Sequence, residues 1–155
     1  DDAIFIGLHD ERLDVALQDI IIPIENVIDR IRPEVVYIPF RGDNNQDHRA
    51  VYDAMRVVIR PISVNSPKTV LMYEAPSSTD QSPPLIENMF MPNYFVDITQ
   101  YIEKKTKAIS CYEMEKRCYP HPRSEEAIKI LAQKRGIESG FRFAESFMIL
   151  RMLWG

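Results

Sequence analysis

The chain has 155 residues, of which 45% are hydrophobic and 27% are charged, a composition typical of one globular domain. Its formal net charge of −4 argues against a nucleic-acid surface, because such surfaces carry a basic stripe. No apolar run approaches the roughly 18 residues that a membrane-spanning helix needs. The composition therefore predicts a cytoplasmic domain without a membrane span and without a nucleic-acid partner.

Apolar residues in the first half of the chain alternate between strand-like runs and helix-like spacing. The run at residues 4–6 predicts a short strand, and the spacing over residues 20–32 predicts an amphipathic helix. The β-branched run at residues 35–39 predicts a buried strand. A helix is predicted over residues 47–60, and a second buried strand over residues 69–73.

The second half of the chain opens with a loop at residues 75–92 that is rich in proline and serine. A loop of this length in a compact domain is usually functional or mobile. Four further elements are predicted: a strand at residues 94–98, a long helix over residues 98–112, a helix that Ser124 caps and Gly136 or Gly140 ends, and a last strand at residues 144–153.

These alternating elements predict an α/β fold. Strands that are separated by helices form mainly parallel sheets, so we expect a three-layer sandwich with a Rossmann-like sheet. In such sheets, ligands bind outside the carboxyl ends of the strands. Cys111 and Cys118 are too far apart in sequence for the Cys-x-x-Cys spacing of structural zinc, and we expect both to be ordinary reduced thiols.

The most informative segment is residues 41–51, at the junction of the predicted strand 35–39 and the helix that follows it. His48 lies three residues before Val51, so it points from the first helical turn toward the side of the buried stripe. A neutral imidazole with the Asp47 carboxylate beside it in sequence can bind a metal. The alternative is a helix cap with a solvated ring.

Residues 41–51 resemble the second signature of the PIG-L/LmbE family of zinc-dependent N-deacetylases, His-x-Asp-His followed by Arg-Ala and a helix. Four further segments are similar to the family's and come in the family's order: residues 31–37, 73–79, 120–124 and 135–147. The resemblance implies that residues 1–155 are the C-terminal two-thirds of a single PIG-L/LmbE-like domain. Its partner would be a small-molecule N-acetyl amino sugar or glycoconjugate.

The resemblance also implies a reaction. Members of the family use a zinc-activated water to remove the acetyl group from an N-acetylated amino sugar or its conjugate, and His48 matches a zinc ligand. Asn45 stands where the family has a His that polarises the oxyanion; an amide N–H can donate to an oxyanion but cannot act as an acid. Asp47, the other catalytic candidate, would orient an imidazole or cap backbone N–H groups.

Four further residues are candidates for substrate binding. Arg49 would hold a sugar hydroxyl, a phosphate or an internal carboxylate, unless it forms a surface salt bridge. Glu74, at the end of a predicted strand, would hold a substrate hydroxyl. His121 and Arg123 lie on a stiff proline-bounded loop that matches a segment bordering the family's substrate cleft. The alternative is that His121 caps the next helix and Arg123 pairs with Glu126.

One departure from the family concerns the metal. Members open with a strand that ends in Ala-His-Pro-Asp-Asp-Glu, which supplies two zinc ligands and a general base, and this motif does not occur here. We therefore expect N-terminal strands of the domain to be missing from the chain, and zinc to be absent or weakly bound. Two hypotheses stay open: a zinc-dependent deacetylase, or a truncated or non-catalytic relative that binds carbohydrate or another ligand or serves a structural role. Neither hypothesis excludes a homo-oligomer.

Overall fold

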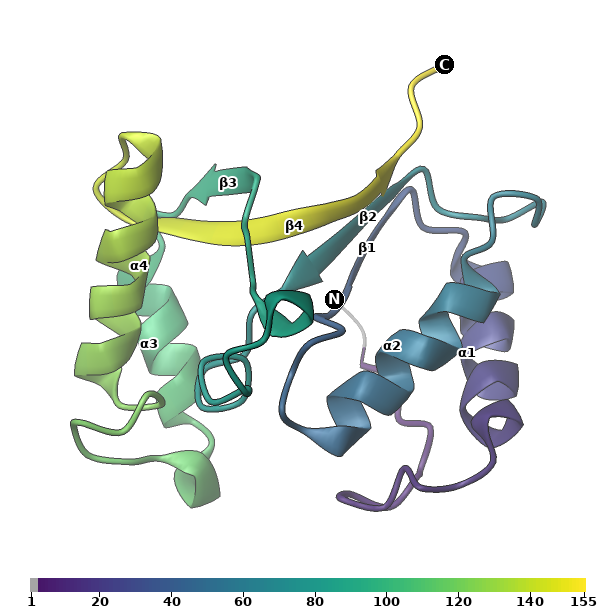
Figure 1. The fold of residues 1–155 in the computed structure, drawn as a ribbon, viewed down its shortest axis with the longest axis horizontal. Coiled ribbons are helices and arrows are strands. Elements are labelled where there is room, and N and C mark those ends of the chain that lie inside the picture. The colour runs from purple at the N-terminus through teal and green to yellow at the C-terminus, as the bar shows by residue number, and fades with distance from the viewer. Residues whose placement is uncertain (1–2) are drawn as a thin grey trace.

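A computed structural model of the chain describes residues 3–155. The elements alternate between helix and strand in the first half and are arranged around one four-stranded sheet of order β1-β2-β4-β3 (Figure 1). In chain order they are α1 (Leu17–Ile31), β1 (Val35–Pro39), α2 (Gln46–Val58), β2 (Thr69–Tyr73), the short 3-10 helix η1 (Ile86–Asn88), β3 (Tyr94–Asp97), α3 (Ile102–Ser110), a second short 3-10 helix η2 (Glu113–Glu115), α4 (Glu125–Ser139) and β4 (Ala144–Met152).

The predicted α/β class is confirmed, but the predicted mainly parallel sheet is wrong. Only β1 and β2 pair in parallel, whereas β4 is antiparallel to both β2 and β3. The reason lies in the connections. One helix joins β1 to β2 and returns the chain to its starting end, but two helices, α3 and α4, separate β3 from β4. Because a second helix carries the chain back again, the next strand enters the sheet in the opposite direction.

The helices form two pairs, which lie at opposite ends of the sheet (Figure 1). The main core lies between α1, α2 and the β1–β2 pair, and its least exposed side chains include Ile20, Ile38, Ala54 and Val70. A smaller cluster of Ile98, Ile102 and Ala132 joins α3 and α4 to the other end of the sheet. Of the three predicted layers, the described residues thus show a sheet with one helix pair at each end.

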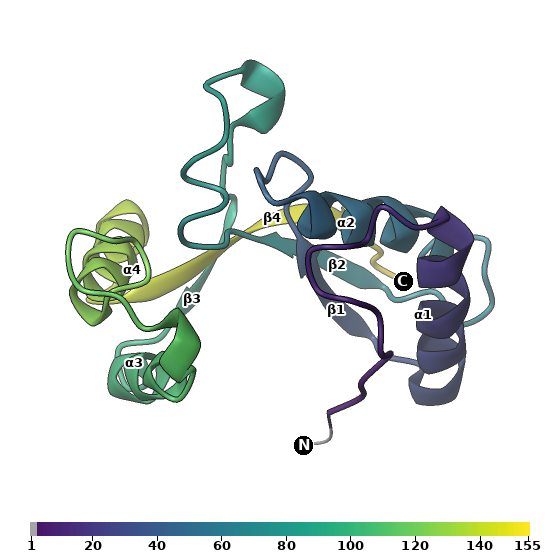
Figure 2. The same ribbon diagram turned by 90° about the horizontal axis from the view of Figure 1, so that it is seen from below.

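The N-terminal segment does not form the strand predicted at residues 4–6. It runs beside the main core in an irregular path (Figure 2), and Phe5 is 91% exposed. A strand needs a hydrogen-bonded neighbour, and no described strand pairs with this segment. Two hydrogen bonds and one side chain join it to the rest of the fold. The Leu13 N–H donates to Asp47 Oδ1 at 3.2 Å, Gln46 Nε2 donates to the Glu11 carbonyl, and the Leu13 side chain packs against the main core.

Helix α4 ends at Gly140, which has a left-handed φ of 79° that glycine adopts without strain. Gly136 lies inside the helix for a different reason. A Cβ atom there would lie 2.5 Å from the backbone oxygen of Phe141, so only glycine lets the following loop fold back against the helix. Ser124 caps α4 as predicted, since its hydroxyl accepts the Ala127 N–H.

The predicted loop 75–92 is a long irregular segment that contains η1 and projects away from the sheet (Figure 2). It packs on the loop after β1, because Ser82 donates to the Gly42 carbonyl and the Phe40 and Phe90 rings meet edge to face. Cys111 and Cys118 are both free, as predicted, and both are exposed. Within residues 3–155, no helix has the length and apolar character that crossing a membrane requires.

Candidate functional site

Asp43 organises the loop between β1 and α2. Its side chain is completely buried although it is ionisable, so its oxygens need partners inside the protein. Oδ1 accepts the backbone N–H of Asn45 at 2.8 Å, and Oδ2 accepts the hydroxyl of Thr79 at 2.8 Å. Thr79 in turn accepts the Ala75 N–H, so this carboxylate ties the end of β1 to the loop that follows β2.

His48 lies on the first turn of α2 with its Nδ1 3.2 Å from Asp43 Oδ2, and its side chain is 30% exposed. The carboxylate beside the imidazole is therefore Asp43, not the adjacent Asp47. A carboxylate at one ring nitrogen fixes the orientation of the ring and leaves the other nitrogen for a ligand or a metal.

The charge of Asp43 is maintained against its burial. Burial alone would raise the pKa of Asp43, but contacts from His48, the Asn45 amide and the Thr79 hydroxyl outweigh it, and the pKa lies below its ordinary value. The pKa of the Tyr73 hydroxyl is raised, first by burial and second by the Asp43 charge. This end of the sheet thus holds a carboxylate beside an imidazole and a neutral phenol.

Asn45 caps α2. Its side-chain oxygen accepts the backbone N–H groups of Asp47 at 2.8 Å and His48 at 3.3 Å. Asn45 is therefore the N-cap of the helix whose first turn carries His48. Asp47 accepts the Leu13 N–H, which holds the N-terminal segment against the helix. The catalytic roles of Asn45 and Asp47 stay predictions.

Substitutions of Asn45 separate capping from donation to an oxyanion. Asn45→Ala is expected to lower the free energy of unfolding by about 1 kcal/mol, because it removes the cap. Asn45→Asp keeps a capping oxygen but loses the amide N–H, so its stability is expected to stay near that of the wild type. If Asn45 donates to an oxyanion, both variants lose roughly 10²–10³-fold in kcat. Urea unfolding and steady-state kinetics on the full-length protein measure the two effects; a wild-type kcat in Asn45→Asp would leave only the cap.

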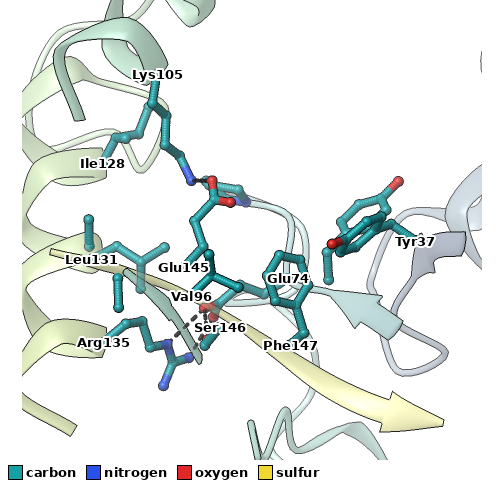
Figure 3. Close-up of a pocket in the computed structure, with 14 residues that line it drawn as sticks. Tyr37, Glu74, Val96, Lys105, Ile128, Leu131, Arg135, Glu145, Ser146 and Phe147 are labelled. Atoms are coloured by element: carbon teal, nitrogen blue, oxygen red, sulfur yellow. Dashed lines mark hydrogen bonds and ion pairs between the residues drawn. The ribbon is translucent and has the colours of Figure 1, made fainter. Parts of the chain in front are cut away.

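Two cavities adjoin at the carboxyl ends of β1 and β2. The first, of about 390 Å³, is lined by Asp47, His48, Val51 and Met55 of α2 together with residues of β1 and β2. The second, of about 410 Å³, lies between the sheet and α4 (Figure 3). Tyr37 and Tyr73 line both cavities, so the two rings form a shared aromatic wall.

The second cavity has ion pairs among its lining residues. Arg135 binds both oxygens of Glu74, with Nε to Oε1 at 2.8 Å and Nη2 to Oε2 at 2.6 Å, as Figure 3 shows. Ser146 donates to the same carboxylate, and Lys105 pairs with Glu145 above it. Both oxygens of Glu74, predicted to hold a substrate hydroxyl, are therefore bonded within the protein.

The other predicted substrate residues lie outside these cavities. Arg49 donates through Nη1 to the carbonyls of Asp43 and Asn44, both at 2.8 Å, so it braces the loop rather than forming a salt bridge. His121 Nδ1 accepts the Arg123 N–H, which closes a local turn before α4. Arg123 pairs with Glu115 rather than Glu126, and its Nε donates to Ser77 at 2.7 Å. Through Ser77, Arg123 contacts the loop that also carries Thr79.

The fit of a zinc ion to these residues is partial. His48, with Asp43 behind it, has the arrangement of a metal ligand supported by a carboxylate. A catalytic zinc takes three protein ligands, and residues 3–155 contain no group of three or more His, Cys, Asp or Glu side chains that could hold a metal. The described residues therefore fit one ligand of a zinc site and not the whole site.

Comparison with known sequences finds a family model that matches the first part of the chain. Residues 1–59 match the sequence model described as "PIG-L: GlcNAc-PI de-N-acetylase", a stretch that includes Asp43, Asn45 and His48. The match covers 59 of the 155 residues, so the first part of the chain is similar to this family. This confirms the resemblance that the loop before α2 indicated.

Solved structures show the same fold at low identity. The conserved protein TT1542 from Thermus thermophilus has a TM-score of 0.70 at 22% identity over 96% of the chain and 66% of its own. GalB, the 4-carboxy-2-hydroxymuconate hydratase of Pseudomonas putida, has a TM-score of 0.66 and 20% sequence identity. The match covers 91% of the chain and 62% of GalB. The N,N'-diacetylchitobiose deacetylase of Pyrococcus horikoshii has a TM-score of 0.64 and 19% sequence identity. The match covers 92% of the chain and 55% of the deacetylase. The chain thus spans between 55% and 66% of the length of these proteins.

The sequence predictions missed two residues that shape the site. Asp43 is not among the site residues predicted from the sequence, although an aspartate two positions before the cap favours a turn in which its side chain accepts a backbone N–H. Tyr37 is predicted only as a strand residue, and the pairing of β1 with β2 brings it to one wall with Tyr73. Its position in a strand parallel to the one that carries Tyr73 was the available signal.

Proposed function

We propose that the protein is a hydrolase that removes the acetyl group from an N-acetylated amino sugar or its conjugate. The observation that carries the proposal is the Asp43–His48 pair, placed at the carboxyl end of β1 and facing a cavity with an aromatic wall. Open α/β sheets bind ligands at this position. The similarity of residues 1–59 to the PIG-L family model supports the same reaction class.

The groups in the cavity have distinct tasks in such a reaction. Asp43 Oδ2 lies 3.2 Å from His48 Nδ1, and this contact would restrain the ring beside the cavity that His48 lines, which lowers the entropic cost of the reaction. Tyr37 and Tyr73 offer apolar ring surface with a polar tip, which suits a sugar that has both C–H and hydroxyl faces. Two proteins of related fold are named as a deacetylase and a hydratase. Both names imply a reaction in which water attacks a carbon atom of the substrate.

We further propose that zinc is the cofactor and that His48 supplies one of its ligands. When bound, a zinc of this type supplies a water of lowered pKa. The substrate is proposed to be a small glycoconjugate and the enzyme to act in the cytoplasm. A non-catalytic relative that only binds carbohydrate is the alternative, since the described residues supply one ligand alone.

The test compares His48→Ala with His9→Ala in the full-length protein, because His9 lies in the exposed N-terminal segment. His48→Ala is expected to lose most of its bound zinc, since removal of one ligand of three disrupts charge and geometry together. It is also expected to stop acetate release from N-acetylglucosamine and N,N'-diacetylchitobiose, whereas His9→Ala retains both properties. Elemental analysis and an acetate assay provide the measurements.

Two results would contradict the proposal. One zinc per chain in His48→Ala would remove His48 from the metal site. Saturable binding of N-acetylglucosamine by the wild type with no acetate release, in the presence of added zinc, would favour the non-catalytic alternative.

A further inference from the structure

A third cavity lies on a different face of α2 and is lined mainly by arginine. Its volume is about 430 Å³, and the five residues that line it are Arg41, Arg49, Tyr52, Asp53 and Arg56. None of them lines the cavity beside His48. Any ligand of this cavity is therefore held by groups separate from those of the proposed hydrolytic site.

The helix brings these side chains together. Arg49, Tyr52, Asp53 and Arg56 occupy positions i, i+3, i+4 and i+7 of α2, which share one face of a helix. Arg41 comes from the loop after β1 and completes the cavity. The same loop and helix thus position both His48 and the arginine-lined cavity, but the two lie on different faces of α2.

The lining carries an excess of positive charge. Three guanidinium groups face one carboxylate, Asp53, and the contact of Asp53 with Arg56 is loose, at 3.8 Å between exposed side chains. The chain as a whole has a net charge of −4, so this concentration of arginine is not a general property of its surface. Like charges gathered around one cavity repel unless an anion lies between them.

Arg49 is already fixed in place. Its Nη1 donates to the carbonyls of Asp43 and Asn44, both at 2.8 Å, and these bonds hold the guanidinium plane. A guanidinium has five N–H donors, so the other donors stay available to a ligand at little further cost in side-chain entropy. The Tyr52 side chain, which is largely buried, adds a second ordered group to the lining.

We propose that this cavity binds a phosphate group. Two negative charges on a phosphate monoester match the excess of two positive charges in the lining, and arginine forks fit phosphate oxygens in pairs. The phosphate belongs either to a soluble phosphate ester or to the headgroup of an anionic lipid, and both present the same oxygens to the arginines.

The test measures binding of inorganic phosphate to the full-length protein by calorimetry, with chloride at equal ionic strength as the reference. The variant is Arg41→Ala/Arg56→Ala, because both side chains are exposed and neither braces the loop as Arg49 does. Arg30→Ala, an exposed arginine on α1, is the matched control. Saturable phosphate binding is expected in the wild type and the control, and the double variant is expected to bind on the order of 100-fold more weakly.

A second arm distinguishes the two sources of phosphate. Co-sedimentation with phosphatidylcholine vesicles that contain phosphatidic acid, lost in the double variant, assigns the cavity to a lipid headgroup. Phosphate binding without vesicle binding assigns it to a soluble ester. Equal phosphate affinity in the wild type and the double variant, or the same heat from chloride as from phosphate, would overturn the proposal.

Discussion

Arg135→Ala is expected to lower the free energy of unfolding by about 3–5 kcal/mol, because it leaves a buried carboxylate without its cation. The side chains of Arg135 and Glu74 are only 8% and 16% exposed, and two hydrogen bonds join them in a bidentate pair. Arg135 also binds Glu138 and lies over the Phe90 ring. Removal of the guanidinium thus affects β2, α4 and the projecting loop together.

The matched control is Lys134→Ala, the neighbouring position on α4. Lys134 is mostly exposed and meets Glu138 at 3.9 Å, so its loss is expected to cost less than about 0.5 kcal/mol. Urea unfolding of both variants measures the difference. Addition of Glu74→Ala to Arg135→Ala is expected to recover part of the loss, since no unpaired charge then remains buried. A loss below about 1 kcal/mol in Arg135→Ala would show that water replaces the guanidinium.

Short apolar runs predicted the bounds of the two strands of the main core, because a strand that packs on a core favours β-branched and apolar residues. Burial was predicted less well in β1, where Val35 and Tyr37 are exposed at the edge of the sheet. The predicted ranges 35–39 and 69–73 coincide with β1 and β2. The same rule fails at residues 4–6, where the apolar side chains are exposed in the described structure. An apolar run specifies the tendency to be buried, but a strand also needs a neighbour, which local sequence does not encode.

The direction of β4 was not predictable from its own residues. Its apolar character is compatible with either orientation, and only the number of helices between β3 and β4 decides between them. Gly136 posed a similar problem. A glycine near the end of a helical pattern usually marks the end, but the structure uses Gly136 for close contact with the loop at Phe141.

The position of the candidate site was predictable, but its internal contacts were not. The strand–loop–helix junction that carries His48 is visible in the sequence because periodicity changes there. The support for that histidine comes from Asp43 and Thr79, which are 36 residues apart. Glu74 and Arg135 are 61 residues apart, and their pairing depends on the approach of α4 to the sheet. Contacts over such separations follow from topology, which the sequence predicted only in part.

Asp43 couples the stability of the loop to the chemistry of His48, and Asp43→Asn tests both. At neutral pH the substitution is expected to cost about 1.5–3 kcal/mol, the usual contribution of hydrogen bonds to a buried charged group. The asparagine oxygen still accepts the Asn45 N–H, so the loop is expected to keep its shape. Asp53→Asn is the control, because Asp53 is exposed and its ion pair is loose. Urea unfolding in a buffer with a chelator measures stability apart from metal binding.

The dependence on pH follows from the direction of the pKa shift. The folded pKa of Asp43 lies below its ordinary value near 3.9, so the unfolded chain takes up the proton first as the pH falls. The stabilisation is therefore complete above a pH of about 4 and is lost as the pH falls through the folded pKa. Between pH 5 and pH 2.5, the difference in stability between wild type and Asp43→Asn is expected to be constant at first and then to shrink. A constant difference throughout would show that the carboxylate is not the source of the effect.

The same variant has a second readout at His48. Replacement of a carboxylate that supports a metal-binding imidazole typically costs 10–100-fold in metal affinity or activity. Asp43→Asn is therefore expected to weaken zinc binding by the full-length protein to this extent, while Asp53→Asn leaves it unchanged. Competition with a chelator of known affinity measures the change. Zinc affinity equal to that of the wild type, together with lower stability, would mean that Asp43 holds the loop and does not act through His48.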